Sequence, residues 1–461
     1  MSLPSENKTN ENESLPQPNG LDAFDIEHGI SDIETPPEVP LSGQFKKCFA
    51  YFTIRYRLPN ILVSLLNSIR EDLKVNPSNY EEADISFVLE SIEKLKTQVE
   101  NNGRLEKIAS KAPDVDIWNN FIANLPENAS FFNICWLYAE CYLYRRIYSL
   151  FEATNTMAQY DYFGPQKMKA LQMSDHVMEE LIQTTDNCEN TCETFCHMLK
   201  LNLWGNKCDL SLSSGKDVKP LENLSQLIVS LNTNILVDDS AAIWNCLNQQ
   251  PAQQQQVADT KYVDLICDNA GFELFTDLLF GQYLLQNALA KVVRYHVKAM
   301  PWFVSDTTAQ DIHKTLKYLE GHKSHVLRDF GKRCSKYFEE GAFQIAEESY
   351  FWTTPYEFYR MSEINPKLYK DLSTSSLLVF KGDLNYRKLL GDFNWNFSDD
   401  FRKCLRGFNP TRLCTLRTIK GDLLCGLKPE SVKCPDLARQ LSEGKNDWMF
   451  TGNYAVIQLL L

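Results

Sequence analysis

The clearest hydrophobic pattern in the chain runs from residue 261 to residue 287, where an apolar run is followed by a periodic one. Residues 262–267 are a short apolar run with branched side chains, which predicts a buried strand. The apolar residues of 272–284 recur mostly at intervals of three and four, which predicts an amphipathic helix. Asp268 and Asn269 lie between the two, at the carboxyl end of the strand, where open α/β sheets bind their ligands. We therefore expect an active site to include this connection.

Short strand-like runs alternate with helical segments through the rest of the C-terminal half. Further strands are predicted at residues 291–299, 377–380, 412–416 and 454–461. Residues 307–319 have helical periodicity, and either Asp306 or Thr307 is placed to cap that helix. The alternation is typical of an α/β/α Rossmann-like domain with a mainly parallel sheet, so we expect an α/β fold class.

Residues 45–250 have a different pattern, in which helical periodicity dominates. Between residues 80 and 101, six apolar residues form one helical stripe: Ile85, Val88, Leu89, Ile92, Leu95 and Val99. Residues 129–152 are apolar on most sides, which predicts a buried helix, and residues 166–184 predict another. The glutamine-rich stretch 245–261 indicates a connection between domains. We expect a helical domain at 45–250 and an α/β domain at 251–461.

Residues 1–44 differ from both domains in composition. They carry nine acidic residues and one lysine, and their net charge of −8 leaves −5 of the total of −13 for the other residues. A segment with so few apolar groups cannot offset its ordering entropy, so we expect a disordered acidic tail. The remaining charge gives no support for nucleic-acid binding through a basic surface.

The overall composition is that of a soluble globular protein, with 44% hydrophobic and 23% charged residues. No apolar run approaches the ~18–20 residues that span a bilayer, and the N-terminus lacks the regions of a signal peptide. We therefore expect a protein of the cytoplasm or nucleus, without membrane association, whose 14 cysteines are thiols.

Four apolar runs end at polar residues: Asp268-Asn269, Ser305-Asp306, Lys381-Gly382-Asp383 and Arg417-Thr418-Ile419-Lys420. Parallel strands end at the same edge of a sheet, so we expect all four to line one crevice. The alternative, which spacing alone leaves open, is that these residues are helix caps and surface ion pairs.

The residue types at these four positions favour phosphoryl chemistry. Asp268, Asn269 and Asp306 offer oxygen ligands, which suit a hard ion such as Mg²⁺ or Mn²⁺. Positive charge suited to a phosphate group comes from Lys420, Arg387 and Lys381. Asp383 and Asn385 are the remaining polar side chains, and they could form hydrogen bonds with the hydroxyls of a sugar or polyol. A metal ion with a cationic grip predicts phosphoryl transfer or hydrolysis.

Other motifs in the chain are weaker or missing. Cys188, Cys192, Cys196 and His197 resemble a zinc site, but three thiols on one helix face are more simply small core residues. His322 and His325 have no third ligand nearby and predict an exposed loop. The chain has no G-x-x-x-x-G-K-[ST] loop, no G-x-G-x-x-G fingerprint and no Cys-x5-Arg phosphatase loop.

Five segments closely resemble the metal-dependent damage-control phosphatases, also called the domain of unknown function 89 family. These are CDNAGFELFTDL, MPWFVSDTT, FKGDLNYRKLLGD, LRTIKGDLLCGL and, in the helical half, NLWGNKCDLSLSSG. The RTxK pattern of Arg417, Thr418 and Lys420 is similar to that of the sugar-phosphate phosphatase subfamily. That subfamily is also described as an acidic-residue (protein-glutamate) O-methyltransferase. The resemblance runs from about residue 45 to the C-terminus.

The resemblance implies roles for individual residues. Asp268, Asn269 and Asp306 correspond to the metal ligands, and Lys420 to the lysine that contacts phosphate. The sugar-phosphate segment corresponds to Asp383, Leu384, Asn385, Tyr386 and Arg387. Under the methyltransferase description, Glu273 lies where S-adenosylmethionine is contacted. The implied activity is hydrolysis of phosphometabolites such as fructose 1-phosphate and fructose 6-phosphate, with Mn²⁺, Co²⁺, Ni²⁺ or Mg²⁺.

Two chemical routes remain open for hydrolysis. In one, water attacks the phosphorus and Asp306 or Asp268 takes its proton. In the other, which we slightly favour, Asp268 attacks and an aspartyl phosphate is hydrolysed later. Two other functions are alternatives: the methyltransferase, which lacks here the glycine-rich loop usual for its cofactor, and a scaffold without activity.

Overall fold

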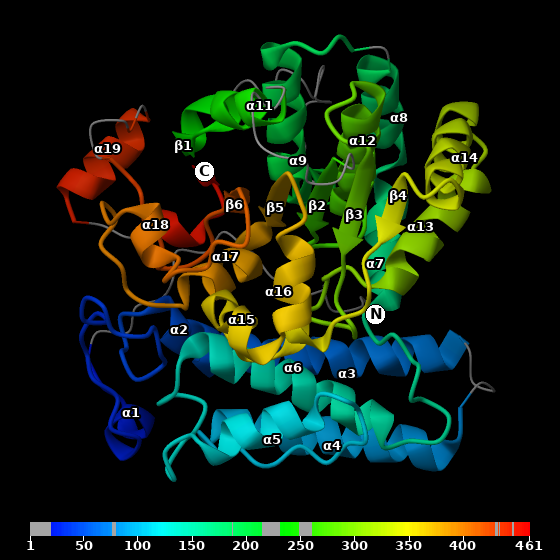
Figure 1. The fold of residues 1–461 in the computed structure, drawn as a ribbon. Helices are drawn as coiled ribbons and strands as arrows, with labels where there is room; N and C mark the ends of the chain where they lie inside the picture. Colours follow the sequence, from blue (N-terminus) through cyan, green and yellow to red (C-terminus); the bar gives the residue numbers. More distant parts are fainter. Residues whose placement is uncertain are drawn as a thin grey trace, which may run out of the picture.

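The computed structural model describes residues 20–75, 80–186, 188–213, 231–248, 261–428, 432, 434–444 and 447–461. Within these residues, seven strands form one sheet in the order β1-β7-β6-β5-β2-β3-β4. The sheet stands over a layer of N-terminal helices, and other helices flank it (Figure 1). The predicted α/β class is confirmed.

The sheet is mainly parallel, as expected. Its strands are β1 (Ile235–Asp238), β2 (Tyr262–Ile266), β3 (Val292–His296), β4 (Phe343–Ile345), β5 (Leu377–Lys381), β6 (Leu413–Thr418) and β7 (Ala455–Leu460). β2 pairs in parallel with β3 and β5, and β5 pairs in parallel with β6. Only the β6–β7 pair is antiparallel among the pairs of this sheet that the described residues form. The sequence pattern missed the short edge strands β1 and β4.

Helices from all parts of the chain pack on the sheet. The N-terminal layer contains α1 (Ala23–Glu27), α2 (Phe49–Phe52), α3 (Leu58–Val75), α4 (Glu82–Glu100), α5 (Val115–Ala123) and α6 (Trp136–Glu152). Then follow α7 (Gly164–Met173), α8 (Asp175–Thr185), α9 (Cys192–Ser213), α11 (Ser240–Asn248), α12 (Phe272–Gln286), α13 (Ala309–Glu320) and α14 (His325–Glu339). The last are α15 (Met361–Ile364), α16 (Pro366–Leu372), α17 (Gly382–Leu390), α18 (Phe401–Cys404) and α19 (Pro435–Ser442).

Two hydrophobic cores lie on the two faces of the sheet. Alternate residues of a strand point to opposite faces, and β5 shows this directly. Leu378 and Phe380 join a core that includes α3, α4, α6 and α17. Leu377 and Val379 join the other core, with α8, α9, α12, α13 and α14. The helical N-terminal half therefore shares a core with the strands instead of forming one of its own.

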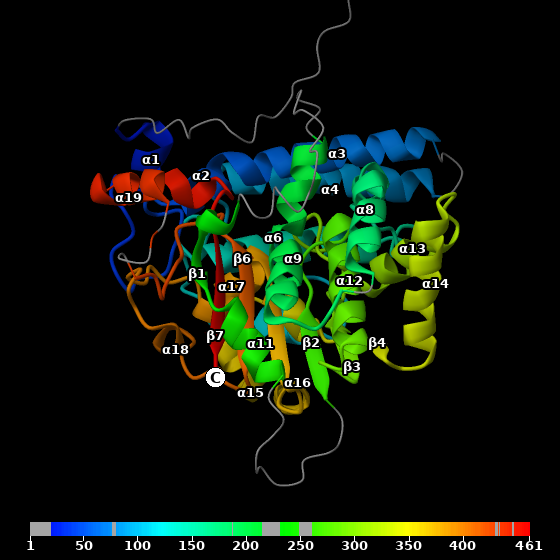
Figure 2. The same ribbon diagram turned by 90° about the horizontal axis from the view of Figure 1, so that it is seen from above.

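The predicted domain boundary does not match this architecture. The stretch 249–260 lies outside the described residues. On its N-terminal side, β1 pairs with β7, and α9 lies beside α12 in both views (Figure 1, Figure 2). Residues 231–248 thus belong to the α/β part of the molecule. The sequence pattern missed this because the composition of a short edge strand such as β1 and of a covering helix such as α9 does not differ from that of a helical domain.

The prediction of a disordered tail is wrong for residues 20–44. Asp22 caps α1 through a capping box with Asp25, and the buried carboxylate of Asp25 forms an ion pair with Lys46. Leu41 is also buried, and its backbone N–H donates to the carbonyl of Asp392 at 2.8 Å. Contacts distant in sequence order this polar segment, which its composition could not reveal. Residues 1–19 lie outside the described residues.

Three predictions about helices need correction. Residues 166–184 form two helices, α7 and α8, which meet at Ser174. Thr308, not Asp306 or Thr307, caps α13, in a capping box with Asp311. The helix α12 is not amphipathic, because each residue from Phe272 to Leu284 is buried between the sheet and α9.

Candidate functional site

Two loops meet at the carboxyl ends of β2 and β3. The backbone N–H of Ala270 donates to the carbonyl of Ser305 at 2.8 Å, and that of Thr307 donates to the carbonyl of Asp268 at 2.7 Å. An antiparallel bridge joins Asn269 to Asp306. The structure therefore brings together Asp268, Asn269 and Asp306, three of the predicted site residues.

The side chain of Asn269 lies between two carboxylates. Its amide nitrogen donates to Asp268 Oδ2 at 2.9 Å and to Glu273 Oε2 at 2.9 Å. Its amide oxygen accepts a short hydrogen bond from the hydroxyl of Ser305. Both amide hydrogens are thus in use, and the orientation of the amide follows from the two acids and the hydroxyl.

The acids of this site are buried close to one another. Asp268 is 9% exposed and Asp306 2%. Burial, together with the charges of Glu273 and Asp306, raises the pKa of Asp268 well above its usual value. Burial also raises the pKa of Asp306 to about 6, although the ammonium of Lys298 lies 3.2 Å from its Oδ2.

These donors fit a hard divalent cation. Two carboxylates and one amide oxygen are the ligand types that such an ion takes, and a bound cation would offset the repulsion that raises the pKa of Asp268. Among the described residues, no three His, Cys, Asp or Glu side chains form a metal-binding group. The candidate set would hold the ion through two acids and an amide.

Two lysines near the acids were missed by sequence reasoning. Lys298 is 3% exposed and donates to the carbonyl of Cys267 at 3.0 Å as well as approaching Asp306. Lys167 of α7 is 5% exposed and lies 2.9 Å from Asp311. Lys298 is the penultimate residue of the predicted strand 291–299 and lies two residues before the motif MPWFVSDTT, so the sequence did carry a signal for this lysine. Lys167 lies 133 residues before the start of that motif, without any sequence signal.

The loop before Asp306 has an unusual backbone. Phe303 and Val304 have φ angles of 41° and 69°, in the left-handed region that a β-branched residue rarely adopts. The ring of Phe303 stacks on Tyr144 of α6, with centroids 4.5 Å apart. The N-terminal helices therefore help to hold a strained turn beside the candidate site.

The predicted substrate segment forms the first turns of α17. Its five residues are Asp383, Leu384, Asn385, Tyr386 and Arg387. Asp383 has a carboxylate that is 20% exposed, and the other four side chains are buried. Asn385 donates to the carbonyl of Lys381 at 2.7 Å, and the hydroxyl of Tyr386 donates to Gln458 of β7 at 2.9 Å. Within this segment, Asp383 is therefore the residue placed to meet a ligand.

Arg387 is engaged inside the protein. Its guanidinium lies 2.5 Å from a carboxylate oxygen of Glu140 and makes two bonds to Asp392, at 2.8 and 2.7 Å. It also lies over the ring of Trp136, 3.6 Å from the centroid. In this arrangement Arg387 links α17 to α6, and it is not the free phosphate grip that the sequence predicted.

Of the RTxK residues, Arg417 and Thr418 are buried, and Lys420 is half-buried. Arg417 is fully buried, donates to Asp383 at 2.8 Å and also bonds the carbonyl of Leu423. Thr418 is buried at the end of β6. Lys420 is half-buried and makes no hydrogen bond or ion pair with another described residue. Burial raises the pKa of Asp383, but Arg417 and Arg387 outweigh it and hold that pKa below its usual value.

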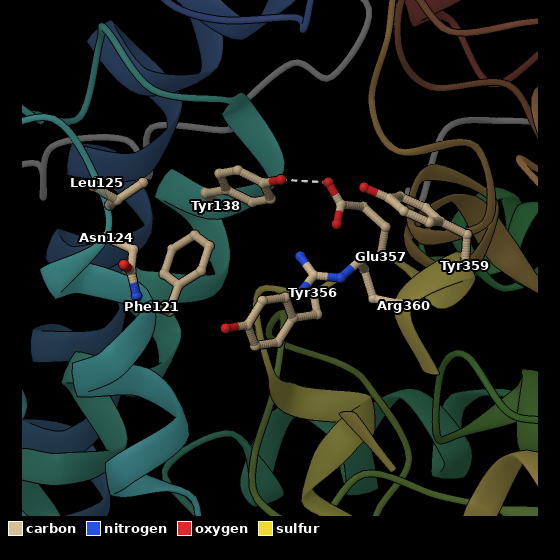
Figure 3. A pocket seen from close by; sticks show the side chains of 8 residues that line it. All are labelled: Phe121, Asn124, Leu125, Tyr138, Tyr356, Glu357, Tyr359 and Arg360. Carbon is tan, nitrogen blue, oxygen red and sulfur yellow. Dashed lines mark hydrogen bonds between the residues drawn. The ribbon is translucent and has the colours of Figure 1, made fainter. Parts of the chain in front are cut away.

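A separate pocket of about 320 Å³ lies between the N-terminal helices and η4 (Phe358–Arg360), as Figure 3 shows. Its lining residues are Phe121, Asn124, Leu125, Tyr138, Tyr356, Glu357, Tyr359 and Arg360. The hydroxyl of Tyr138 donates a short hydrogen bond to Glu357 (Figure 3). No predicted site residue lines this pocket, so it is distinct from the strand-end site.

The cysteine cluster remains apart from this site. Cys192 and Cys196 lie one turn apart near the start of α9, with their sulfurs 4.0 Å apart. The imidazole of His322 donates from Nε2 to the carboxylate of Asp175 at 3.0 Å, so this histidine has a structural partner. Among the described helices, none is long and apolar enough to cross a bilayer.

Comparison with known proteins places the chain among phosphatases. The family described as "Damage-control phosphatase ARMT1-like domain" matches residues 53–434. Damage-control phosphatase ARMT1 of Xenopus tropicalis is 35% identical over 92% of this chain and 99% of its own length. The Danio rerio and Homo sapiens proteins of that name are 36% and 32% identical, over 92% and 91% of this chain and 97% of each relative.

A solved structure of a DUF89 family protein from Pyrococcus horikoshii is 14% identical to this chain, with a TM-score of 0.42. The alignment covers 86% of this chain and 95% of that one. The family match spans most of the chain, and these three sequence relatives exceed 30% identity over nearly their whole length. The chain therefore belongs to the damage-control phosphatase ARMT1-like family.

Proposed function

We propose that this protein is a metal-dependent phosphoric monoester hydrolase that acts on sugar phosphates. The observation that carries the proposal is the meeting of Asp268, Asn269 and Asp306 at the ends of neighbouring parallel strands. Lys420 lies at the end of β6 in the same sheet, and its charge acts on Asp268. Metal ligands and a phosphate-binding cation on one sheet edge are the parts that phosphate-ester hydrolysis needs.

In this proposal, Asp268, Asn269 and Asp306 hold a divalent ion, which would be Mn²⁺, Co²⁺, Ni²⁺ or Mg²⁺. When bound, the ion supplies Lewis-acid polarisation of the phosphoryl group. Lys420 binds the phosphate oxygens and stabilises the negative charge that grows on them in the transition state. Asp383, held by Arg417 at 2.8 Å, accepts hydrogen bonds from sugar hydroxyls.

The attacking group is either Asp268 or water. Asp268 Oδ2 accepts a hydrogen bond from Asn269, and both oxygens of the carboxylate keep a lone pair for attack on the phosphorus. If water attacks, Asp268 or Asp306 accepts its proton. Acid quenching after brief incubation with ³²P-labelled substrate separates the routes. Protein-bound label that Asp268→Asn abolishes supports covalent attack, and its absence during wild-type turnover excludes it.

The test of the proposed function is a screen of purified protein against sugar phosphates and divalent metals. We expect fructose 1-phosphate and fructose 6-phosphate to be hydrolysed in the presence of one or more of the four metals. Chelation by EDTA and the variants Asp268→Ala and Asp306→Ala should abolish phosphate release. Turnover that persists in either variant, or in EDTA, contradicts the proposal.

The methyltransferase alternative is not favoured. The relatives carry a phosphatase name, and the carboxylate of Glu273 is 5% exposed and bonded to Asn269 and Lys381. A contact with S-adenosylmethionine would have to displace these partners. Measuring methyl transfer by Glu273→Gln and Asp306→Ala would separate the two chemistries. The methyltransferase description requires Glu273 as a cofactor contact, whereas the phosphatase proposal requires Asp306 as a metal ligand and gives it no role in methylation.

A further inference from the structure

A row of four buried polar residues runs from α9 to the candidate metal site. Asn202 donates to Asp277 Oδ1 at 2.6 Å, and the ammonium of Lys381 lies 2.6 Å from the same oxygen. Lys381 also lies 3.1 Å from Glu273 Oε1, and Glu273 Oε2 accepts from Asn269. We call Asn202, Asp277, Lys381 and Glu273 the Lys381 network.

The Lys381 network is closed to solvent, since its members are between 0% and 5% exposed. Burial lowers the pKa of Lys381, but the charges of Asp277 and Glu273 outweigh it and leave the pKa above its usual value. Lys381 is therefore a fixed cation held by two acids of α12, one helical turn apart. The phosphate-binding role that the sequence predicted for Lys381 does not fit this position.

The end of the Lys381 network determines how Asn269 presents its amide. Glu273 and Asp268 each accept one of the two amide hydrogens of Asn269, at 2.9 Å. A flipped amide would set its oxygen against both carboxylates, which is unfavourable, so the oxygen stays on the side of Ser305. Lys381 in turn restrains Glu273, and α9 restrains Lys381 through Asp277.

We propose that the Lys381 network is a positioning device that holds the amide oxygen of Asn269 ready for the metal ion. Its residues act through Asn269 and touch neither metal nor substrate. Glu273 is then a positioning residue and not a cofactor contact. The inference rests on the proposed metal-dependent function, and it adds a dependence of metal affinity on α9, whose residue Asn202 lies 67 positions before Asn269 in the sequence.

The test is Mn²⁺ binding to the metal-free full-length protein without substrate, measured by titration calorimetry and by electron paramagnetic resonance. Asp277→Asn is the decisive variant, because Asp277 contacts Lys381 and Asn202 but not Asn269. Outer partners of metal ligands typically change affinity about 10- to 100-fold when mutated. We expect Asp277→Asn and Glu273→Gln to weaken Mn²⁺ binding by about that factor.

The matched control is Asp114→Asn, which breaks another buried ion pair, the 2.7 Å contact with Arg145 in the helical layer. It should lower the melting temperature but leave Mn²⁺ affinity unchanged. If the wild type binds Mn²⁺ and both Asp277→Asn and Glu273→Gln bind it with the same affinity, the inference is overturned and the proposed function still stands. A wild type that binds no divalent metal overturns both.

Discussion

The carboxylate of Asp268 occupies the space that a side chain at position 382 would need. Gly382 has a φ angle of +80°, and a Cβ built on it would lie 1.9 Å from Asp268 Oδ2. Gly382 is also the first residue of α17, so the carboxyl end of β2 packs directly on the carboxyl end of β5. This close approach places Asp268 beside the substrate segment.

Gly382→Ala should therefore remove activity by displacing Asp268. Misplacement of a reacting group by about 1 Å costs on the order of 100-fold in rate, and we expect at least that loss of kcat/KM. Gly407→Ala is the control, because Gly407 has a φ of +91° and open space around it. Both variants carry the left-handed penalty of about 1–2 kcal/mol. Gly382→Ala adds the clash with Asp268, so its unfolding temperature should fall further than that of Gly407→Ala, and activity should fall only in Gly382→Ala. Full activity of Gly382→Ala would show that Asp268 is not required in its place.

Divalent metal should stabilise the wild type but not a variant without its carboxylates. A ligand at 100 times its Kd stabilises the folded state by about 2.7 kcal/mol, which differential scanning calorimetry detects as a rise in Tm. In Asp268→Asn/Asp306→Asn the rise should disappear. Each protein is compared with and without metal, because Asp306→Asn also removes the ion-pair partner of the buried Lys298 and so changes the stability of the metal-free protein. An equal rise in Tm in both proteins would place the metal elsewhere.

Substitution of Lys420 and of Arg387 should have different effects on the stability of the protein. Lys420→Ala should reduce activity on every phosphorylated substrate and leave Tm unchanged, because Lys420 has no ion pair among the described residues. Arg387→Ala leaves Glu140 and Asp392 buried without their partner, and loss of one member of a buried pair costs about 3–5 kcal/mol. Thermal unfolding gives the Tm of Lys420→Ala, and urea unfolding gives the free energy of unfolding of Arg387→Ala. An Arg387→Ala protein of wild-type stability would restore the direct substrate role that the family resemblance implies.

Asp422 should make stability depend on pH. Burial raises its pKa to about 6, although it accepts a 2.8 Å hydrogen bond from the backbone N–H of Phe49. The folded state then holds a proton that the unfolded state releases at lower pH, so this contribution to stability falls as pH rises from about 4 to about 6. Asp422→Asn keeps an acceptor for Phe49 and should remove that slope. Parallel curves of unfolding free energy against pH for the two proteins would contradict the assignment.

Much of the candidate site was within reach of the sequence. An apolar run that stops at Asp268 and Asn269, followed by a helical period, marks a strand end in an α/β sheet. The other three strand-end motifs then pointed to Asp306, Asp383 and Lys420 as candidates. These motifs could be grouped from the sequence because parallel strands end at one edge of the sheet whatever their spacing in the chain. The fold class followed from the same alternation.

The sequence by itself did not decide which polar groups face a ligand. Arg387, Lys381 and Tyr386 have the residue types of a substrate site, yet each is bound by a partner far away in the chain: Glu140, Asp277 and Gln458. A buried ion needs a counter-charge, and only the packing of α6, α12 and β7 shows where it comes from. Residues 20–44 were misjudged for the same reason, because their order depends on contacts with the loop that follows α17. Local pattern determined five of the seven strands and their ends, and tertiary packing decided which of the charges beside them remain free.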